Sequence, residues 1–172
     1  LTNEDEEIIS FVRDLGYETT SDPRGNQHAA KGAHRKEVRQ FFSMHDLLGA
    51  RSWEKFVPDS LKLAPIEERL ELLRGLMDTD GTVDERGRAY YISTSRQLAE
   101  DVQWIARSLG RKARLRVRHT KYPYKGEVLD GRESYQVRLW HPKLSAVFKL
   151  SRKKNRCTDA WNGGDGDEMS RG

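Results

Sequence analysis

Two carboxylates and a glycine end the apolar stretch "LLRGLMDTDG", residues 72–81. The C-terminal end of an α-helix carries a partial negative charge, so acidic side chains are electrostatically unfavourable there unless a cation lies close by. Carboxylate oxygens at such a position suit a hard divalent cation, which can assist hydrolysis. Asp78 and Asp80 are therefore candidates for a metal-dependent site, with Gly81 directly after them.

A calcium loop and a plain turn are the alternatives to a catalytic metal site at Asp-Thr-Asp-Gly. An EF-hand calcium loop needs a glycine at its sixth position and a glutamate at its twelfth. Counted from Asp78, the glycine is fourth and position twelve is Ala89, so the spacing excludes an EF-hand. A plain turn stays open: the aspartates would tolerate the helix exit and Gly81 would take a positive φ angle.

The element that carries these acids is predicted to be a helix from 65 to 81. Pro65 suits the first helical position. Gly75 lies inside the helix at a cost of about 1 kcal/mol relative to alanine. That cost predicts that another backbone approaches closely there. The apolar residues recur with helical spacing at Ile66, Leu70, Leu73, Leu76 and Met77.

A basic stretch further along the chain alternates like a strand. Between 111 and 125 there are seven Lys or Arg and no Asp or Glu, which predicts a local positive surface. Residues 114–118 and 134–140 alternate polar with apolar side chains, while 122–128 is predicted to be a loop. The polar face of the predicted ribbon consists of Arg114, Arg116, Arg118, Gln136 and Arg138. A solvated sheet face is the alternative to an anion-binding one.

Two predicted helices look like copies of each other. One opens at Thr2 or Asn3 and the other at Thr94 or Ser95, and each shows one apolar face before a terminating glycine. A second pair of similar segments, 41–55 and 139–154, recurs at a similar offset. The pattern predicts an internal duplication, with chance likeness of small helices as the alternative. It divides the chain into a first half-domain (1–64), a second (65–157) and a flexible tail (158–172).

Composition restricts the class of protein. The chain is 35% hydrophobic and 34% charged, which is typical of a polar globular protein, and no apolar run approaches membrane-spanning length. Cys157 is the single cysteine and the five histidines lack zinc-site spacing, so we expect a cytoplasmic, reducing location without disulfides or zinc. A net charge of +4, segregated from the acidic stretch 3–18, favours an anionic polymer such as nucleic acid as partner.

The segment "LRGLMDTDG", residues 73–81, resembles the LAGLIDADG motif of homing endonucleases. The wider block from 54 to 95 resembles the version of this family that is carried inside inteins, and the likeness extends from Leu1 to about Arg156. The resemblance implies an α+β fold, a pseudo-two-fold αββαββα duplication. In that fold two LAGLIDADG helices pack side by side and two saddle-shaped antiparallel sheets straddle the DNA major groove.

The resemblance also implies roles for particular residues. The second Asp of the motif, Asp80, would hold Mg²⁺ (or Mn²⁺), with the backbone carbonyl of Thr79 as a further ligand. The lysine in "EKFVP", Lys55, would be catalytic, and its counterpart in "LSRKKNR" would be Lys153 rather than Lys154. Asp78, Gly75 and Gly81 would be structural. The DNA-binding residues would be Arg114, Arg116, Arg118, Lys121, Gln136 and Arg138.

The sequence departs from the two-motif pattern in one respect. No first LAGLIDADG helix with its own acid is present, and we expect the missing acid upstream of Leu1, although the protein could instead lack it. The chain would then complete its site as a pseudo-dimer, or as a homodimer through the 66–77 helix. Splice-junction residues are absent too, so intein splicing halves and a host protein would lie outside this chain.

Three functions remain open from the sequence. The first is a site-specific, Mg²⁺-dependent, double-strand DNA endonuclease borne by an intein. The second is a catalytically inactive module of the same kind that binds nucleic acid, similar to maturases or to transcription regulators. The third is a basic globular domain without catalysis.

Overall fold

The chain forms two compact units, Leu1–Arg51 and Ser52–Gly172, in the computed structural model, which describes residues 6–21, 28–32, 35–119, 121–124 and 126–159. The division falls after Arg51 rather than after Ala64, because residues 52–64 pack with the second unit: Val57 is 4% exposed in its core. The predicted caps Thr2 and Asn3 and residues 160–172 of the predicted tail lie outside the described residues. In the described part, no helix has the length and apolarity to cross a membrane.

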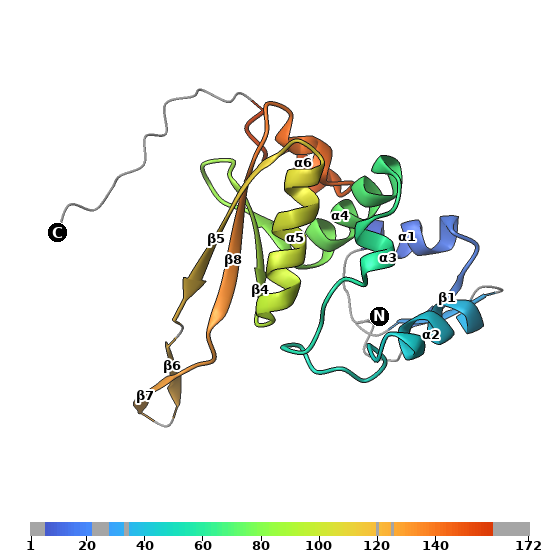
Figure 1. The fold of residues 1–172 in the computed structure, drawn as a ribbon, viewed down its shortest axis with the longest axis horizontal. Coiled ribbons are helices and arrows are strands. Elements are labelled where there is room, and N and C mark those ends of the chain that lie inside the picture. Colours follow the sequence, from blue (N-terminus) through green and yellow to red (C-terminus); the bar gives the residue numbers. More distant parts are fainter. Residues whose placement is uncertain (1–5, 22–27, 33–34, 120, 125, 160–172) are drawn as a thin grey trace. The chain divides into compact units, whose positions relative to one another are not determined.

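The first unit consists of a helix, a hairpin and a second helix (Figure 1). Its elements are α1 (Glu6–Asp14), β1 (Glu18–Ser21), β2 (His28–Lys31) and α2 (Arg35–Met44). The strands β1 and β2 pair antiparallel. Helix α1 starts with acidic residues, which the N-terminal dipole favours, and buries Ile8 and Ile9.

The second unit is built around a four-stranded antiparallel sheet in the order β3-β4-β8-β5. Its strands are β3 (Gly81–Val83), β4 (Ala89–Ser93), β5 (Lys112–Arg118) and β8 (Ser134–Trp140). Its helices are α3 (Asp59–Lys62), α4 (Ile66–Asp80), α5 (Arg96–Ser108), the 3₁₀ turn η1 (Leu144–Val147) and α6 (Ser151–Lys154). From α4 onward, the helices and the strands of the four-stranded sheet follow in the order α4-β3-β4-α5-β5-β8. This is the predicted helix–strand–strand pattern twice, and the predicted α+β class is confirmed.

A separate hairpin extends beyond β5 and β8 (Figure 1). It pairs β6 (Lys121–Tyr124) with β7 (Glu127–Asp130) in a two-stranded antiparallel sheet. The predicted loop over 122–128 is therefore wrong. A proline and several charges hide the strand alternation in this segment, and pairing of the two backbones decides its structure instead.

The two helices that look alike in sequence end in the same way. Gly16 follows α1 with φ +83°, and Gly110 follows α5 with φ +75°, a conformation that favours glycine. The next residue in each case donates its N–H five residues back, from Tyr17 to the Val12 carbonyl and from Arg111 to the Ala106 carbonyl. Both ends are thus Schellman-type caps, and the internal duplication stays a prediction.

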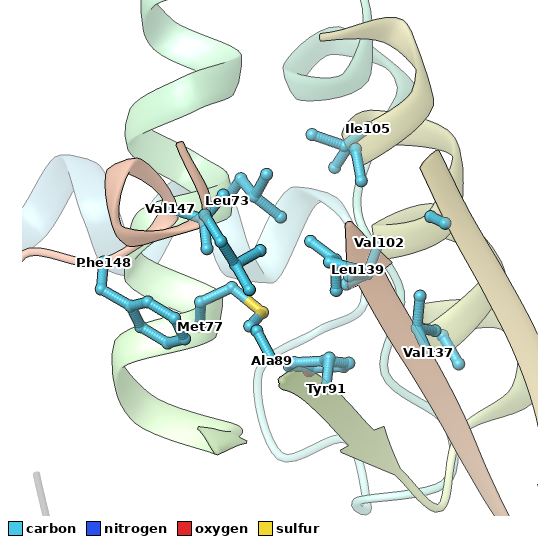
Figure 2. Packing of buried hydrophobic residues seen from close by; sticks show 14 of the residues in the cluster. Leu73, Met77, Ala89, Tyr91, Val102, Ile105, Val137, Leu139, Val147 and Phe148 are labelled. Atoms are coloured by element: carbon cyan, nitrogen blue, oxygen red, sulfur yellow. The ribbon is translucent and has the colours of Figure 1, made fainter. Parts of the chain in front are cut away.

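The core of the second unit lies between the helices and one face of the sheet. Figure 2 shows Leu73 and Met77 of α4 beside Tyr91 of β4, with Val102 and Ile105 of α5 across from them. All five side chains are 0% exposed. The polar face of the sheet lies on the other side, because successive strand residues point to opposite faces.

Candidate active site at the end of α4

The C-terminal end of α4 holds a buried lysine. Lys153 is 6% exposed, and its Nζ donates to the carbonyls of Met77 at 2.8 Å, Asp78 at 2.6 Å and Gly81 at 2.6 Å. The last carbonyls of a helix lack intrahelical partners and carry its negative partial charge. The ammonium group of Lys153 is therefore the cation that offsets the charge at this helix end.

Asp78 is turned toward α6 and away from solvent. It is 5% exposed, and its carboxylate accepts the Lys149 N–H at 2.9 Å and the Leu150 N–H at 3.2 Å. Burial raises the pKa of Asp78, while these two backbone donors and the nearby Lys153 lower it, and the net direction is upward. These contacts support the structural role that the sequence analysis assigned to Asp78. With Lys153 and Gly81, Asp78 forms what we call the capped side of the helix end.

Gly81 is required by close packing and not by its backbone angles. Its φ of −81° is open to any residue, so the turn with a positive φ is wrong. A Cβ built on Gly81 would instead meet the Met77 carbonyl oxygen and lie 2.8 Å from the Met77 Cα. The glycine therefore lets the chain pass directly from α4 into the edge strand β3.

Asp80 and Thr79 form the open side of the same helix end. Both residues are exposed. Within the described part of the chain, no hydrogen bond or ion pair engages the Asp80 carboxylate. The Thr79 hydroxyl donates back to the carbonyls of Gly75 and Leu76 at 3.0 and 3.2 Å. The Thr79 carbonyl is one of the last four of α4 and has no intrahelical partner. The open side thus offers a carboxylate and a backbone carbonyl to a ligand.

Tyr91 lies between the core and the open side. It pairs with Gly81 across β3 and β4 and is 0% exposed. Its hydroxyl is buried and has no hydrogen-bond partner among the described residues. Burial, and then the charge of Asp80, raise the pKa of Tyr91. The hydroxyl is a neutral donor close enough to Asp80 for the carboxylate to affect its ionisation.

The donor chemistry of the open side fits half of a magnesium site. Mg²⁺ prefers oxygen ligands and is commonly held by one or two carboxylates together with water and substrate phosphate. Asp80 supplies one carboxylate and Thr79 one carbonyl. The described residues contain no group of three or more His, Cys, Asp and Glu that could hold a metal by themselves. A cation bound here would need a second carboxylate or a phosphate to complete its ligands.

The predicted DNA-binding residues gather on the polar face of the sheet, with one exception. Arg114 lies opposite Arg138, and Arg116 opposite Gln136, in the β5–β8 pairing. Like charges directly opposite each other destabilise a sheet unless an anion offsets them. Arg114, Arg116 and Arg118 are exposed.

Two of the predicted DNA-binding side chains have neighbours of their own. The Arg138 guanidinium stacks over Trp140 at 4.3 Å, which fixes one end of the polar face. Lys121 is the exception to the common face: it lies on β6, and its Nζ is 3.8 Å from the Asp130 carboxylate. The polar face of β5 and β8 is therefore the better candidate for a nucleic-acid surface.

The two predicted catalytic lysines differ in their surroundings. Lys153 donates to three carbonyls, which occupies the three hydrogens of its ammonium group. It can position the helix end, whereas the neighbouring Lys154 is exposed. Lys55 is exposed in a segment without helix or strand. Of the two predicted lysines, Lys55 is the one whose side chain can reach a ligand.

A known protein family matches a stretch of the chain that contains most of α4 and of the four-stranded sheet. Residues 67–138, from the first turn of α4 to β8, match the family described as LAGLIDADG-like domain. These residues are a LAGLIDADG-like domain. The matched stretch contains Asp78, Asp80 and all five residues of the polar face.

Relatives of the LAGLIDADG-like domain occur within much longer proteins. The replicative DNA helicase DnaB of Nostoc sp. is 36% identical over 122 residues, which are 67% of this chain and 13% of the relative. DnaB of Synechocystis sp. is 38% identical over 100 residues, 55% of this chain and 11% of the relative. DnaB of Rhodothermus marinus is 38% identical over 99 residues, 54% of this chain and 10% of the relative. The chain therefore spans 13% or less of the length of these relatives.

One solved structure, from a study of mesophilic variants of the homing endonuclease I-DmoI, is similar over 91% of this chain and 70% of that chain. The TM-score is 0.47 and the identity 13%.

Sequence reasoning missed three residues of the LAGLIDADG-like domain that matter to the site. Tyr91 gave no signal, because an aromatic residue in a strand is ordinary. Ser95 was visible only as a possible helix cap. Asp101 could have been found: it interrupts the apolar face of α5 between Leu98 and Val102, where an acid needs partners.

Proposed function

We propose that this chain is part of a site-specific double-strand DNA endonuclease that depends on Mg²⁺ or Mn²⁺. The observation that carries the proposal is the exposed Asp80 carboxylate at a helix end where the other acid, Asp78, is bound by backbone N–H groups and Lys153 binds the carbonyls. An exposed acid beside a helix C-terminus is unfavourable in the free protein. A bound cation would offset this unfavourable negative charge at Asp80.

In the proposed reaction, the residues of the chain have separate tasks. A divalent cation, when bound, would polarise the scissile phosphodiester and activate water. Asp80 and the Thr79 carbonyl would hold it, while Lys153 and Asp78 keep the helix end rigid. Lys55 would place a positive charge near the transition state. The arginines of the polar face would bind phosphates and read base edges in the major groove.

We further propose that the domain lies within an intein in the gene of a replicative helicase. Support comes from the relatives, which are DnaB proteins matched over a small part of their length. The missing first acid would come from a residue outside this chain or from a second copy. Gly75 and the half-buried Leu72 and Leu76 leave room beside α4 for a partner helix: a Cβ on Gly75 would meet nothing within 4 Å.

An intracellular, reducing location goes with this proposal. Cys157 is the single cysteine of the chain, and burial, followed by the charge of Asp159, raises the pKa of its thiol to about 11. Such a thiol reacts slowly, because the thiolate is the reactive form. We expect no disulfide and no role for Cys157 in splicing.

The experiment uses the full-length protein that carries these residues. It is mixed with a plasmid containing the uninterrupted helicase-gene sequence, and with a matched plasmid whose site is interrupted by the insert. The proposal expects linear product from the first plasmid only, in Mg²⁺ and not in excess EDTA. Binding of the uninterrupted site without cleavage in Mg²⁺ or Mn²⁺ would contradict it.

A catalytically inactive nucleic-acid-binding module is the second candidate function. The observation that favours it is that the described residues contain no group of three or more His, Cys, Asp and Glu that could hold a metal. The polar face does not need Asp80 in order to bind a duplex. The two functions separate in the same experiment, because the module would bind the site and leave the plasmid circular.

A further inference from the structure

The segment around Lys55 is held in place by two side chains at the start and in the middle of α5. Residues 51–58, all within the described part, form no helix or strand. The Ser95 hydroxyl donates to the Lys55 carbonyl at 2.6 Å, and the Asp101 carboxylate accepts the Val57 N–H at 2.8 Å. We propose that Ser95 and Asp101 are positioning residues that place Lys55 for DNA cleavage, an inference that rests on the proposed function.

Ser95 ties this segment to the first turn of α5. It is 1% exposed, and its oxygen accepts the Leu98 N–H at 3.1 Å as the N-cap of the helix. The same hydroxyl donates its hydrogen to the Lys55 carbonyl. A cap needs only the acceptor, so the donor function of the hydroxyl serves the Lys55 segment.

Asp101 is a buried carboxylate on the apolar face of α5, 3% exposed. Burying a charge is unfavourable unless it is paired and hydrogen-bonded. Besides the Val57 N–H, Asp101 accepts from the Lys62 Nζ at 2.8 Å and from the Gln97 Nε2 at 3.0 Å. Of these three donors, the Val57 N–H is the one that ties the backbone next to Lys55 to α5.

A third contact fixes the segment before Lys55. The Arg132 guanidinium stacks over the Trp53 ring at 3.7 Å. The backbone is therefore held before, at and after Lys55, while the Lys55 side chain is exposed. A fixed backbone with a free side chain suits a residue that must meet a substrate at a set position. A displacement of about 1 Å can slow catalysis about 100-fold.

The first test is Ser95→Gly in the full-length protein. Glycine is a good N-cap residue that costs only a few tenths of a kcal/mol relative to serine, so the helix keeps its start and the segment loses the hydroxyl. We expect the single-turnover cleavage rate to fall about 10- to 100-fold, with DNA affinity unchanged. Ser108→Ala is the matched control on the same helix, because its hydroxyl donates to the Ile105 carbonyl at 2.8 Å and not to the Lys55 segment. It should leave the rate within about twofold.

The second test asks whether Ser95 acts through Lys55. In a Lys55→Ala background, Ser95→Gly should change the rate by less than about twofold, because residues that act through one another are not additive. An equal loss in both backgrounds would overturn the positioning role and leave a purely structural one. An unchanged rate for Lys55→Ala, in a protein that cleaves, would overturn it as well.

A readout independent of cleavage keeps the two proposals separate. Amide hydrogen exchange at Val57 should be slow in the parent protein and faster by about 10-fold or more in Asp101→Ala, which has no side-chain acceptor, without a change at Ile105. Equal protection of the Val57 amide in both proteins would overturn the positioning role, whether or not the protein cleaves. Absence of cleavage in a parent protein with a protected Val57 amide would count against the proposed function alone.

Discussion

The two sides of the α4 end each carry an aspartate, but the surroundings of the two aspartates differ. On the capped side, Asp78 and Lys153 are buried and their charged groups meet backbone: Asp78 accepts two N–H groups, and Lys153 donates to three carbonyls. On the open side, Asp80 is exposed and has no partner within the described residues. The contrast teaches that residue type alone does not separate a structural acid from a functional one, since burial and partners decide.

The largest effect on stability should come from the lysine of the capped side. Lys153→Met removes three charge-assisted hydrogen bonds from buried carbonyls at the end of α4. We expect the free energy of unfolding to fall by about 3 kcal/mol, measured by urea denaturation.

The exposed neighbour Lys154 provides the control for Lys153. Lys154→Met should change the free energy of unfolding by no more than about 0.5 kcal/mol. Equal losses for the two lysines would remove the distinction between the capped side and its exposed surroundings.

The acid of the capped side should have the next largest effect. Asp78→Ala leaves the N–H groups of Lys149 and Leu150 unpaired, and should lower the free energy of unfolding by about 2 kcal/mol. Asp80→Ala should change it by no more than about 0.5 kcal/mol. If the two alanine variants were equally stable, the two acids would not differ in role as the structure indicates.

The pH dependence of stability should also distinguish Asp78 from Asp80. The pKa of Asp78 is raised, mainly by burial, so the folded protein binds this proton more tightly than the unfolded chain. Its contribution to stability is therefore full below the ordinary Asp value of about 3.9 and is lost as pH rises through the raised value. Asp78→Asn should flatten this part of the pH profile, and Asp80→Asn should leave it unchanged.

The fold was largely predictable, and the capped side was not. The helix of 65–81, the Arg-faced strands and the two glycine-terminated helices follow from spacing that is local in the sequence. The partners of Lys153 lie more than seventy residues away and are backbone carbonyls, which have no sequence signature. The same limit applies to Asp101 and Val57, whose contact joins a helix to a segment forty-four residues earlier.

The exposed arginines of the polar face should, like Asp80, contribute to ligand binding and not to the stability of the fold. Arg116→Ala should leave the free energy of unfolding within about 0.5 kcal/mol. It should weaken DNA binding and reduce the slope of log affinity against log salt by about 0.9, the value for one phosphate contact. Titrations at several salt concentrations measure both quantities, and an unchanged slope would remove Arg116 from the phosphate-binding surface.

At Tyr91, which lies between the two sides, a substitution should not lower the free energy of unfolding. Its buried hydroxyl has no partner among the described residues, so Tyr91→Phe should leave the free energy of unfolding unchanged or raise it by up to about 1 kcal/mol. Urea denaturation at neutral pH measures this difference. A loss of more than about 1 kcal/mol would show that the hydroxyl is satisfied in the folded protein.

The central claim is that Asp80, and not Asp78, is the acid that serves cleavage. Its most direct test is Mg²⁺-dependent cleavage of the uninterrupted site by full-length Asp80→Asn, with DNA binding and unfolding measured on the same preparation. The account predicts a cleavage rate at least about 100-fold below that of the parent protein, with site binding retained and stability unchanged. Cleavage by Asp80→Asn at the parent rate would contradict it.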